Sequence, residues 1–172
     1  LLVLVREGRE LSDHTRQVDT LTLANLRGVD DDALGVPVAV DVGVALRRLG
    51  DPLDKNTDIG AINSSMQLSK IEELTASGEA EGAERWSPTC PIPDKGFWFP
   101  PTVFTNVTQA HRIAREEIFG PVLSVLTFRT PEEAVAKANN TPFGLSAGIW
   151  TEKGSRILWM ANQMRAGIVW AN

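Results

Sequence analysis

The sequence contains no tyrosine, one cysteine and only two histidines among its 172 residues. A lone cysteine cannot form an internal disulfide, and it cannot hold a metal ion without further ligands. His14 and His111 are not spaced for a metal site or for a catalytic triad with any neighbour, so we expect both to be surface or capping residues. The scarcity of these side chains excludes disulfide scaffolds and predicts no metal site.

Positive charge and long apolar runs are also scarce. The formal net charge is -5, and no basic stripe is interleaved with aromatic residues, which argues against a nucleic-acid partner. No apolar run is long enough to cross a bilayer, and no signal peptide is recognisable. Apolar residues make up 42% and charged residues 23% of the chain, as in an ordinary globular protein. We therefore expect a cytoplasmic protein with no membrane partner.

The most informative stretch is Glu116-Glu117-Ile118-Phe119-Gly120-Pro121-Val122. Gly120 allows backbone angles that other residues avoid, and Pro121 fixes its own φ and lacks an amide hydrogen. An apolar run follows, which is typical of a buried strand. The stretch thus predicts a fixed turn that holds Glu117 and Phe119 at the end of a strand, where ligands often bind in parallel sheets.

Strand-like and helix-like segments alternate along the rest of the chain. Strands are expected near 82–86, 97–104, 122–128, 146–150 and 168–170. Helices are expected from Ser64 to about Gly78, from Thr108 to Ala114, from Thr130 to Asn139, and around a buried set of Ile157, Leu158, Ala161 and Met164 that ends near Gly167. Ser64 with Gln67 fits a capping box, and Thr130-Pro131-Glu132-Glu133 is a strong helix start. This alternation predicts an α/β fold with a mostly parallel sheet flanked by helices.

The central stretch resembles the signature of the aldehyde dehydrogenase superfamily. Three further stretches match in the right order: Gly50-Asp51-Pro52-Leu53 with Thr57-Asp58-Ile59-Gly60, Asn139-Asn140-Thr141-Pro142-Phe143-Gly144-Leu145-Ser146-Ala147-Gly148-Ile149-Trp150, and Gly167-Ile168-Val169-Trp170-Ala171-Asn172. The resemblance implies that residues 49–172 form an incomplete, Rossmann-like aldehyde dehydrogenase catalytic domain. Residues 1–48 match poorly.

Within the poorly matching part, Leu1–Val5 is typical of a short buried strand. The segment Arg6–Leu46 departs from the family pattern, and either an insertion or a misread gene sequence would explain it. The chain starts without methionine and stops inside a strand-like run, so we expect a fragment.

The resemblance implies that Glu117 holds the nicotinamide ribose of NAD or NADP, because a carboxylate can accept hydrogen bonds from two hydroxyls at once. It also implies that Phe119 packs against the nicotinamide end. The alternative is a solvated glutamate at a helix end and a phenylalanine in the core.

In relatives, a glutamine and a lysine at the positions of Gln67 and Lys70 approach the cofactor ribose. A spacing of three places both on one helical face. The alternative for Gln67 is that the capping box uses its side chain, and the alternative for Lys70 is an ordinary solvated lysine.

Cys90 is not expected to be the family's nucleophile. It lies in the proline-rich loop Ser87–Gly96, and nothing around it in the sequence would activate a thiol. By position, it also follows the place where the nucleophile belongs. We assign no catalytic residue to this chain.

The implied reaction oxidises an aldehyde to a carboxylic acid with NAD or NADP, and the implied full-length form is a homo-oligomer. No match to the nucleophile, oxyanion donor, general base or pyrophosphate loop occurs, so we expect the chain alone to be inactive. The alternative is a non-catalytic module that packs with a partner chain. Acyl-phosphate reductases share the fold and the cysteine chemistry, but the central motif favours an aldehyde dehydrogenase.

Overall fold

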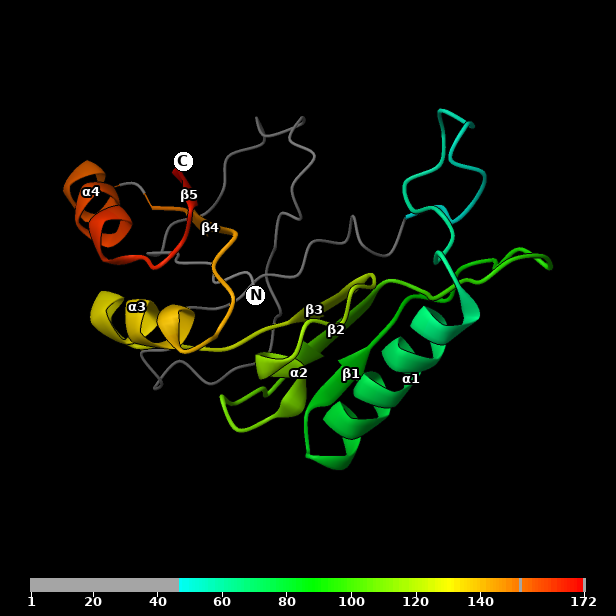
Figure 1. The fold of residues 1–172 in the computed structure, drawn as a ribbon, viewed down its shortest axis with the longest axis horizontal. Helices are drawn as coiled ribbons and strands as arrows, with labels where there is room; N and C mark the ends of the chain where they lie inside the picture. The colour runs from blue at the N-terminus through cyan, green and yellow to red at the C-terminus, as the bar shows by residue number, and fades with distance from the viewer. Residues whose placement is uncertain (1–46, 152, 172) are drawn as a thin grey trace. The chain divides into compact units, whose positions relative to one another are not determined.

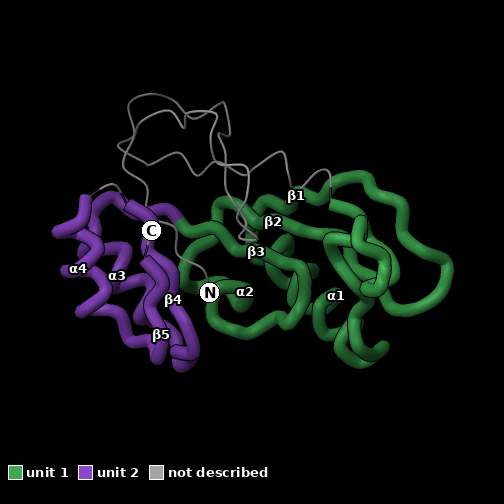
Figure 2. The backbone as a smooth tube through the Cα atoms, turned by 90° about the horizontal axis from the view of Figure 1, so that it is seen from above, with its two compact units in different colours: residues 1, 42–126 green, residues 2–41, 127–172 purple. Residues whose placement is uncertain are grey.

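The structure is a computed structural model that describes residues 47–151 and 153–171 (Figure 1). The predictions for Leu1–Val5 and Arg6–Leu46 lie outside the described residues. Contacts divide the described chain into two compact units, residues 47–126 and residues 127–171, which Figure 2 shows in different colours.

Helix α1, Ser65–Ala80, begins where the sequence predicts. The Ser64 hydroxyl accepts a hydrogen bond from the Gln67 amide at 3.2 Å, which satisfies one of the unpaired amides of the first turn. Ile71 and Leu74 are fully buried and Leu68 is half-buried, so the predicted apolar stripe is confirmed. The capping box is only half formed, because the Gln67 side chain turns away from Ser64 and bonds elsewhere.

Gly78 does not end α1, as the sequence suggested, but lies buried inside it. A β-carbon built on Gly78 would lie 2.8 Å from Ile113 Cδ1 and 3.3 Å from Phe104 Cε1. The missing side chain therefore lets α1 approach the rest of the unit closely. This packing requirement outweighs the weak helix propensity of glycine.

The first unit contains a three-stranded sheet of β1 (Glu84–Trp86), β2 (Thr102–Thr105) and β3 (Val122–Ser124). Strand β2 is central. It pairs antiparallel with β1 and parallel with β3, where Thr102 lies opposite Val122. The core of the unit comprises Ile71, Leu74, Ala83, Phe99, Phe104, Val107, Ile113, Ala114 and Ile118. It joins α1 to the sheet and to the segment that leads into β3.

The short helix α2, Arg112–Arg115, begins later than predicted. Thr108 forms a turn instead of capping the helix, because its hydroxyl accepts from the Ala110 amide. His111 occupies the N-cap position of α2, but its side chain makes no capping hydrogen bond and is buried, not at the surface. Its Nδ1 accepts from the Thr108 amide at 2.7 Å, and its Nε2 lies 2.8 Å from the Glu81 carbonyl oxygen. The ring therefore carries its hydrogen on Nε2 and ties α2 to the end of α1.

The second unit contains α3 (Pro131–Asn139), β4 (Ser146–Ile149), α4 (Gly154–Gln163) and β5 (Ile168–Ala171). The predicted start of α3 is confirmed: the Thr130 hydroxyl accepts from the Glu133 amide, and Pro131 occupies the first helical position. Strands β4 and β5 run parallel, with α4 between them in sequence.

Helix α4 differs from its prediction in two ways. Leu158 is 69% exposed and Met160 is buried in its place, since Met160 shares the buried face with Ile157, Ala161 and Met164. The helix ends at Gln163, four residues before Gly167. Asn139 accounts for the early stop: its side-chain amide donates to the Gln163 carbonyl at 2.7 Å, and its oxygen accepts from the Arg165 amide at 2.8 Å.

The alternation of strands and helices is confirmed, and the chain has an α/β fold. Of the three strand pairings within the described residues, two are parallel and one is antiparallel. The sequence suggested one sheet, whereas these strands form two separate sheets. Periodicity identifies strands but not their partners, so this difference could not be read from the sequence.

Candidate functional site

The candidate site is the loop Glu116–Pro121, which connects α2 to β3. Its side chains alternate in burial. Ile118 is 8% exposed and belongs to the core, whereas Phe119 is 71% exposed and Glu117 is also exposed. The predicted core position for Phe119 is thus excluded. Ile118 anchors the loop in the core. Its neighbours in sequence, Glu117 and Phe119, expose a carboxylate and an aromatic ring to solvent.

The loop lies at a strand end, as predicted, but at the amino end of β3. Because β2 runs parallel to β3, the amino end of β2 lies at the same edge. The rule that ligands bind beyond the carboxyl ends of parallel strands therefore does not apply to this loop. The evidence that this loop is a functional site therefore comes from its own residues and not from its place in the sheet.

Phe119 has a φ of 53°, in the left-handed region. Bulky residues rarely adopt this conformation, which costs about 1–3 kcal/mol and persists only where the surroundings impose it. A residue that is both strained and exposed contributes little to packing. The combination therefore points to a role for the ring beyond folding.

Three contacts fix the backbone of the loop. The Gln67 side-chain amide donates to the Ile118 carbonyl at 2.7 Å and to the Phe119 carbonyl at 3.3 Å. A β-carbon on Gly120 would lie 2.6 Å from Ile71 Cδ1, so this glycine lets the loop lie directly on α1. The Pro121 carbonyl accepts from the Thr102 amide at 2.8 Å, which joins the loop to β2.

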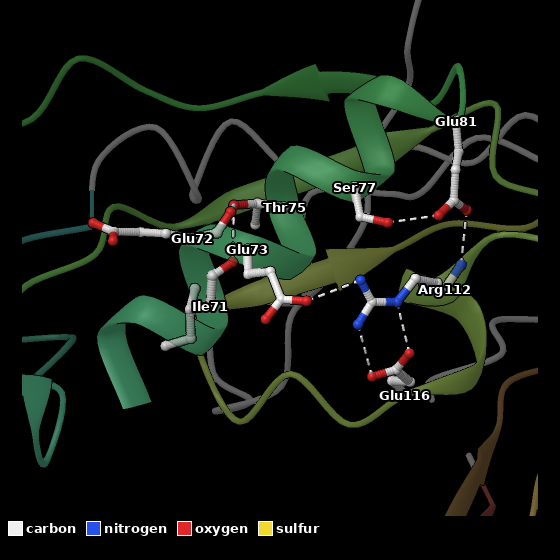
Figure 3. Close-up of polar contacts among 8 residues, drawn as sticks. All are labelled: Ile71, Glu72, Glu73, Thr75, Ser77, Glu81, Arg112 and Glu116. Atoms are coloured by element: carbon white, nitrogen blue, oxygen red, sulfur yellow. Dashed lines mark hydrogen bonds and ion pairs between the residues drawn. The ribbon is translucent and has the colours of Figure 1, made fainter. Parts of the chain in front are cut away.

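The two adjacent glutamates have different surroundings. Figure 3 shows Glu116 paired with Arg112, whose Nε lies 2.8 Å from Oε1 and whose Nη2 lies 3.3 Å from Oε2. Hydrogen bonding to Arg112 holds the pKa of Glu116 below its usual value. Arg112 also contacts Glu73 on α1, and its amide donates to Glu81. Glu116 is therefore a structural residue.

Glu117, by contrast, makes no hydrogen bond or ion pair within the described part of the chain. Its acceptor oxygens remain available to a ligand. The predicted alternative, a solvated glutamate at a helix end, matches its exposure equally well, so the carboxylate alone does not decide between the two interpretations.

Lys70 is exposed one turn beyond Gln67 on α1, and its charge helps to lower the pKa of Glu116 after the larger effect of Arg112. The structure thus brings Gln67 and Lys70 to the same loop as Glu117 and Phe119. Cys90 lies in the irregular segment between β1 and β2, half-buried and unpaired.

This set of residues can bind a flat, hydroxyl-bearing ligand. The Phe119 ring offers an apolar face, the Glu117 carboxylate can accept from two hydroxyls, and Lys70 supplies a nearby positive charge. Among the described residues, no group of acidic, histidine and cysteine side chains could hold a metal ion. No described helix combines the length and the apolar character that a bilayer span needs.

Comparison with known proteins identifies the relatives of this chain. The profile of the aldehyde dehydrogenase family matches residues 40–172. Betaine aldehyde dehydrogenase 2 from Rhizobium meliloti is 43% identical over 129 residues, which cover 75% of this chain and 27% of that protein. This chain belongs to the aldehyde dehydrogenase family.

Solved structures agree with this assignment. An indole-3-acetaldehyde dehydrogenase in complex with NAD+ has a TM-score of 0.69 and 43% identity, covering 73% of this chain and 26% of the other. A 3,6-anhydro-L-galactose dehydrogenase in complex with NAP has a TM-score of 0.70 and 36% identity, covering 75% and 28%. The chain therefore spans about a quarter of the length of the relatives that it matches.

Proposed function

We propose that this chain is part of an NAD(P)-dependent aldehyde dehydrogenase, which oxidises an aldehyde to a carboxylic acid, and that it supplies the surface for the nicotinamide end of the cofactor. When bound, the cofactor accepts the hydride that leaves the aldehyde carbon. The observation that carries the proposal is the exposed Phe119 ring in a left-handed backbone conformation beside Glu117, whose carboxylate has no partner among the described residues.

Each residue of the site has a separate task in this proposal. Glu117 accepts hydrogen bonds from the two hydroxyls of the nicotinamide ribose and so fixes the sugar. Phe119 packs against the nicotinamide end and excludes water from one side of it. Lys70 lies near the ribose, and its positive charge also offsets the negative charge of the two glutamates.

Nicotinamide mononucleotide is the sharpest probe, because it carries only the half of the cofactor that this loop is proposed to bind. We expect it to shift the amide NMR signals of Glu117 and Phe119, whereas adenosine monophosphate should not. Glu117→Gln should weaken nicotinamide mononucleotide about tenfold, because hydrogen bonds to a charged acceptor are lost. The matched control is Glu72→Gln, which removes an exposed carboxylate on α1 and should leave binding nearly unchanged. Equal effects of the two substitutions would contradict the proposal.

We further propose that the 172-residue chain does not oxidise aldehydes by itself. Its single cysteine, Cys90, lies in an irregular segment and opens no helix, so it lacks one of the common means of activating a thiol. The purified chain, incubated with several aldehydes and NAD+, should form no NADH above the blank. Measurable turnover would refute this part. A cytoplasmic location and a homo-oligomeric full-length form stay predictions.

A non-catalytic packing module is the second candidate. Strand β5 favours it, because Val169 packs against the core of the second unit while Ile168 and Trp170 are 53% and 69% exposed. A parallel strand that is apolar on both faces is usually covered on both. Co-expression with a separately encoded first half distinguishes the candidates: restored activity indicates an enzyme part, and a stable but inactive complex indicates a packing module.

A further inference from the structure

The side chain of Gln67 connects two segments that are far apart in sequence. It extends from the first turn of α1 and donates hydrogen bonds to the carbonyls of Ile118 and Phe119, which lie 51 and 52 residues later in the chain. The distances are 2.7 Å to Ile118 and 3.3 Å to Phe119. One amide thus serves two consecutive carbonyls of the candidate site.

This double contact explains how Phe119 is held. With φ at 53°, Phe119 sits in a conformation that a bulky residue leaves unless something opposes it. The Ile118 and Phe119 carbonyls, which flank the N–Cα bond of Phe119, accept from one donor group, so φ of Phe119 cannot change much without breaking a hydrogen bond. A glutamine suits this position because its amide carries two N–H donors and no charge.

The base of the Gln67 side chain is itself fixed. Its backbone amide donates to the Ser64 hydroxyl at 3.2 Å, which is the N-cap interaction of α1. The side chain takes no part in that cap, so it is available to the loop. The cap and the loop contact therefore use different groups of Gln67.

We propose that Gln67 is a positioning residue for the nicotinamide site, which acts through the backbone of the loop by holding Phe119 in the left-handed conformation. The inference rests on the proposed function, since it assumes that Glu117 and Phe119 are the groups that meet the nicotinamide half. It assigns to Gln67 a different task from that of Glu117.

Hydrogen exchange in the 172-residue chain tests the contact without any ligand. The Val122 amide donates to the Gly120 carbonyl at 2.7 Å, so its exchange reports opening of the loop. The Val125 amide, which donates to the Phe104 carbonyl at 2.9 Å, reports the adjoining strand. Gln67→Met keeps the length of the side chain and removes the donor. It should accelerate exchange at Val122 about tenfold and leave Val125 within about twofold of wild type.

The isosteric variant Gln67→Glu adds a pH-dependent test. An ionised carboxylate would face two carbonyl oxygens and repel them, whereas the protonated form can donate one hydrogen bond. Protection of Val122, relative to Val125, should therefore be lost at about pH 8 and recover as the pH falls to about 5. The charged groups on or beside the loop are Glu116 and Glu117 on the loop itself, Arg112 and Arg115 on α2, and Lys70 and Glu73 on α1. All of them are present in wild type and in Gln67→Met, so neither of these should show the recovery.

Ser64→Ala is the matched structural control. It removes the N-cap bond to the backbone amide of Gln67 and leaves the side-chain amide in place, so exchange at Val122 and Val125 should accelerate to a similar extent. If Gln67→Met shows the same uniform pattern, or retains wild-type exchange at Val122, the positioning role is refuted.

Binding of nicotinamide mononucleotide separates this inference from the proposed function. Gln67→Met should weaken the probe about tenfold, and Gln67→Glu should weaken it at about pH 8 and regain affinity on acidification together with the protection of Val122. If Glu117→Gln weakens the probe while Gln67→Met does not, the positioning inference fails and the proposed function stands. If Glu117→Gln has no effect, the proposed function fails, and the exchange data alone decide whether Gln67 holds the loop.

Discussion

Arg112 donates hydrogen bonds to Glu116 from two of its guanidinium nitrogens, while Glu117, the next residue, is exposed to solvent. Arg112 also reaches Glu73 on α1 at 3.0 Å, so one cation connects the first carboxylate of the loop to the helix that carries Gln67. The adjacent glutamates therefore divide their tasks: the first fixes the loop and the second faces outward.

This arrangement predicts a specific loss of stability in acid. The hydrogen bond from Arg112 lowers the pKa of Glu116 from its usual 4.5, so the pair stabilises the fold above that value. Its contribution is lost as the pH falls through the lowered pKa of the folded state. Arg112→Leu should therefore reduce the difference between the urea midpoints measured at about pH 7 and about pH 3. Arg115→Leu is the control, and an unchanged difference in Arg112→Leu would contradict the prediction.

The backbone of Phe119 predicts an opposition between stability and binding. Phe119→Asn should raise the free energy of unfolding by about 1 kcal/mol, because asparagine tolerates the left-handed region and the exposed ring contributes little packing. Phe119→Val should lower it, since a β-branched residue fits that region worst. Both should weaken nicotinamide mononucleotide. Urea unfolding and NMR titration measure the two effects, and a destabilised Phe119→Asn would show that the ring matters for folding.

The close contact between Gly120 and Ile71 predicts that a methyl group added at residue 120 destabilises the fold. Gly120→Ala places a β-carbon 2.6 Å from Cδ1 of a fully buried isoleucine, so we expect a loss of about 1–3 kcal/mol in unfolding free energy. Ile71→Val removes that Cδ1 atom. The double variant should therefore be more stable than the sum of the two single losses predicts, as a double-mutant cycle would show. Simple additivity would mean that the loop moves away instead.

Asn139 predicts a local effect in the second unit. Its side chain both donates to the Gln163 carbonyl and accepts from the Arg165 amide, so Asn139→Ala should cost about 1 kcal/mol in urea unfolding. Asn139→Asp keeps the acceptor and should retain part of the stability. Asn140→Ala, at the exposed neighbouring position, provides the comparison. A larger loss for Asn140→Ala than for Asn139→Ala would be inconsistent with the bridge.

Features governed by neighbouring residues could be predicted from the sequence. The starts of α1 and α3 followed from Ser64 and Thr130, since a cap depends on residues within one turn. A turn before β3 followed from Gly120 and Pro121, but the predicted use of glycine's special backbone angles at Gly120 was wrong, because the left-handed residue is Phe119. The apolar stripe of α1 followed from its spacing.

Features governed by tertiary contacts could not be predicted from the sequence. Gly78 looked like a helix end because glycine usually marks one, yet its role is to admit Ile113. His111 carries no signal of burial in its neighbours, and its two partners are Thr108 and the distant Glu81 carbonyl. In the candidate site, the four predicted residues gather at one loop, but the partner of Gln67 and the left-handed backbone of Phe119 depend on packing that no local pattern encodes.

Two glycines at the packing contacts of α1, one in the helix and one in the loop that lies on it, also limit how this protein can be engineered. Replacing a helical glycine by alanine is a common route to greater thermal tolerance. Here Gly78 within α1 and Gly120 opposite it leave room for Ile113 and Ile71 respectively, so the usual remedy would push the helix away from its neighbours. Substitutions that raise heat resistance are better sought at the exposed polar positions of α1, where a larger side chain extends into solvent without a steric clash.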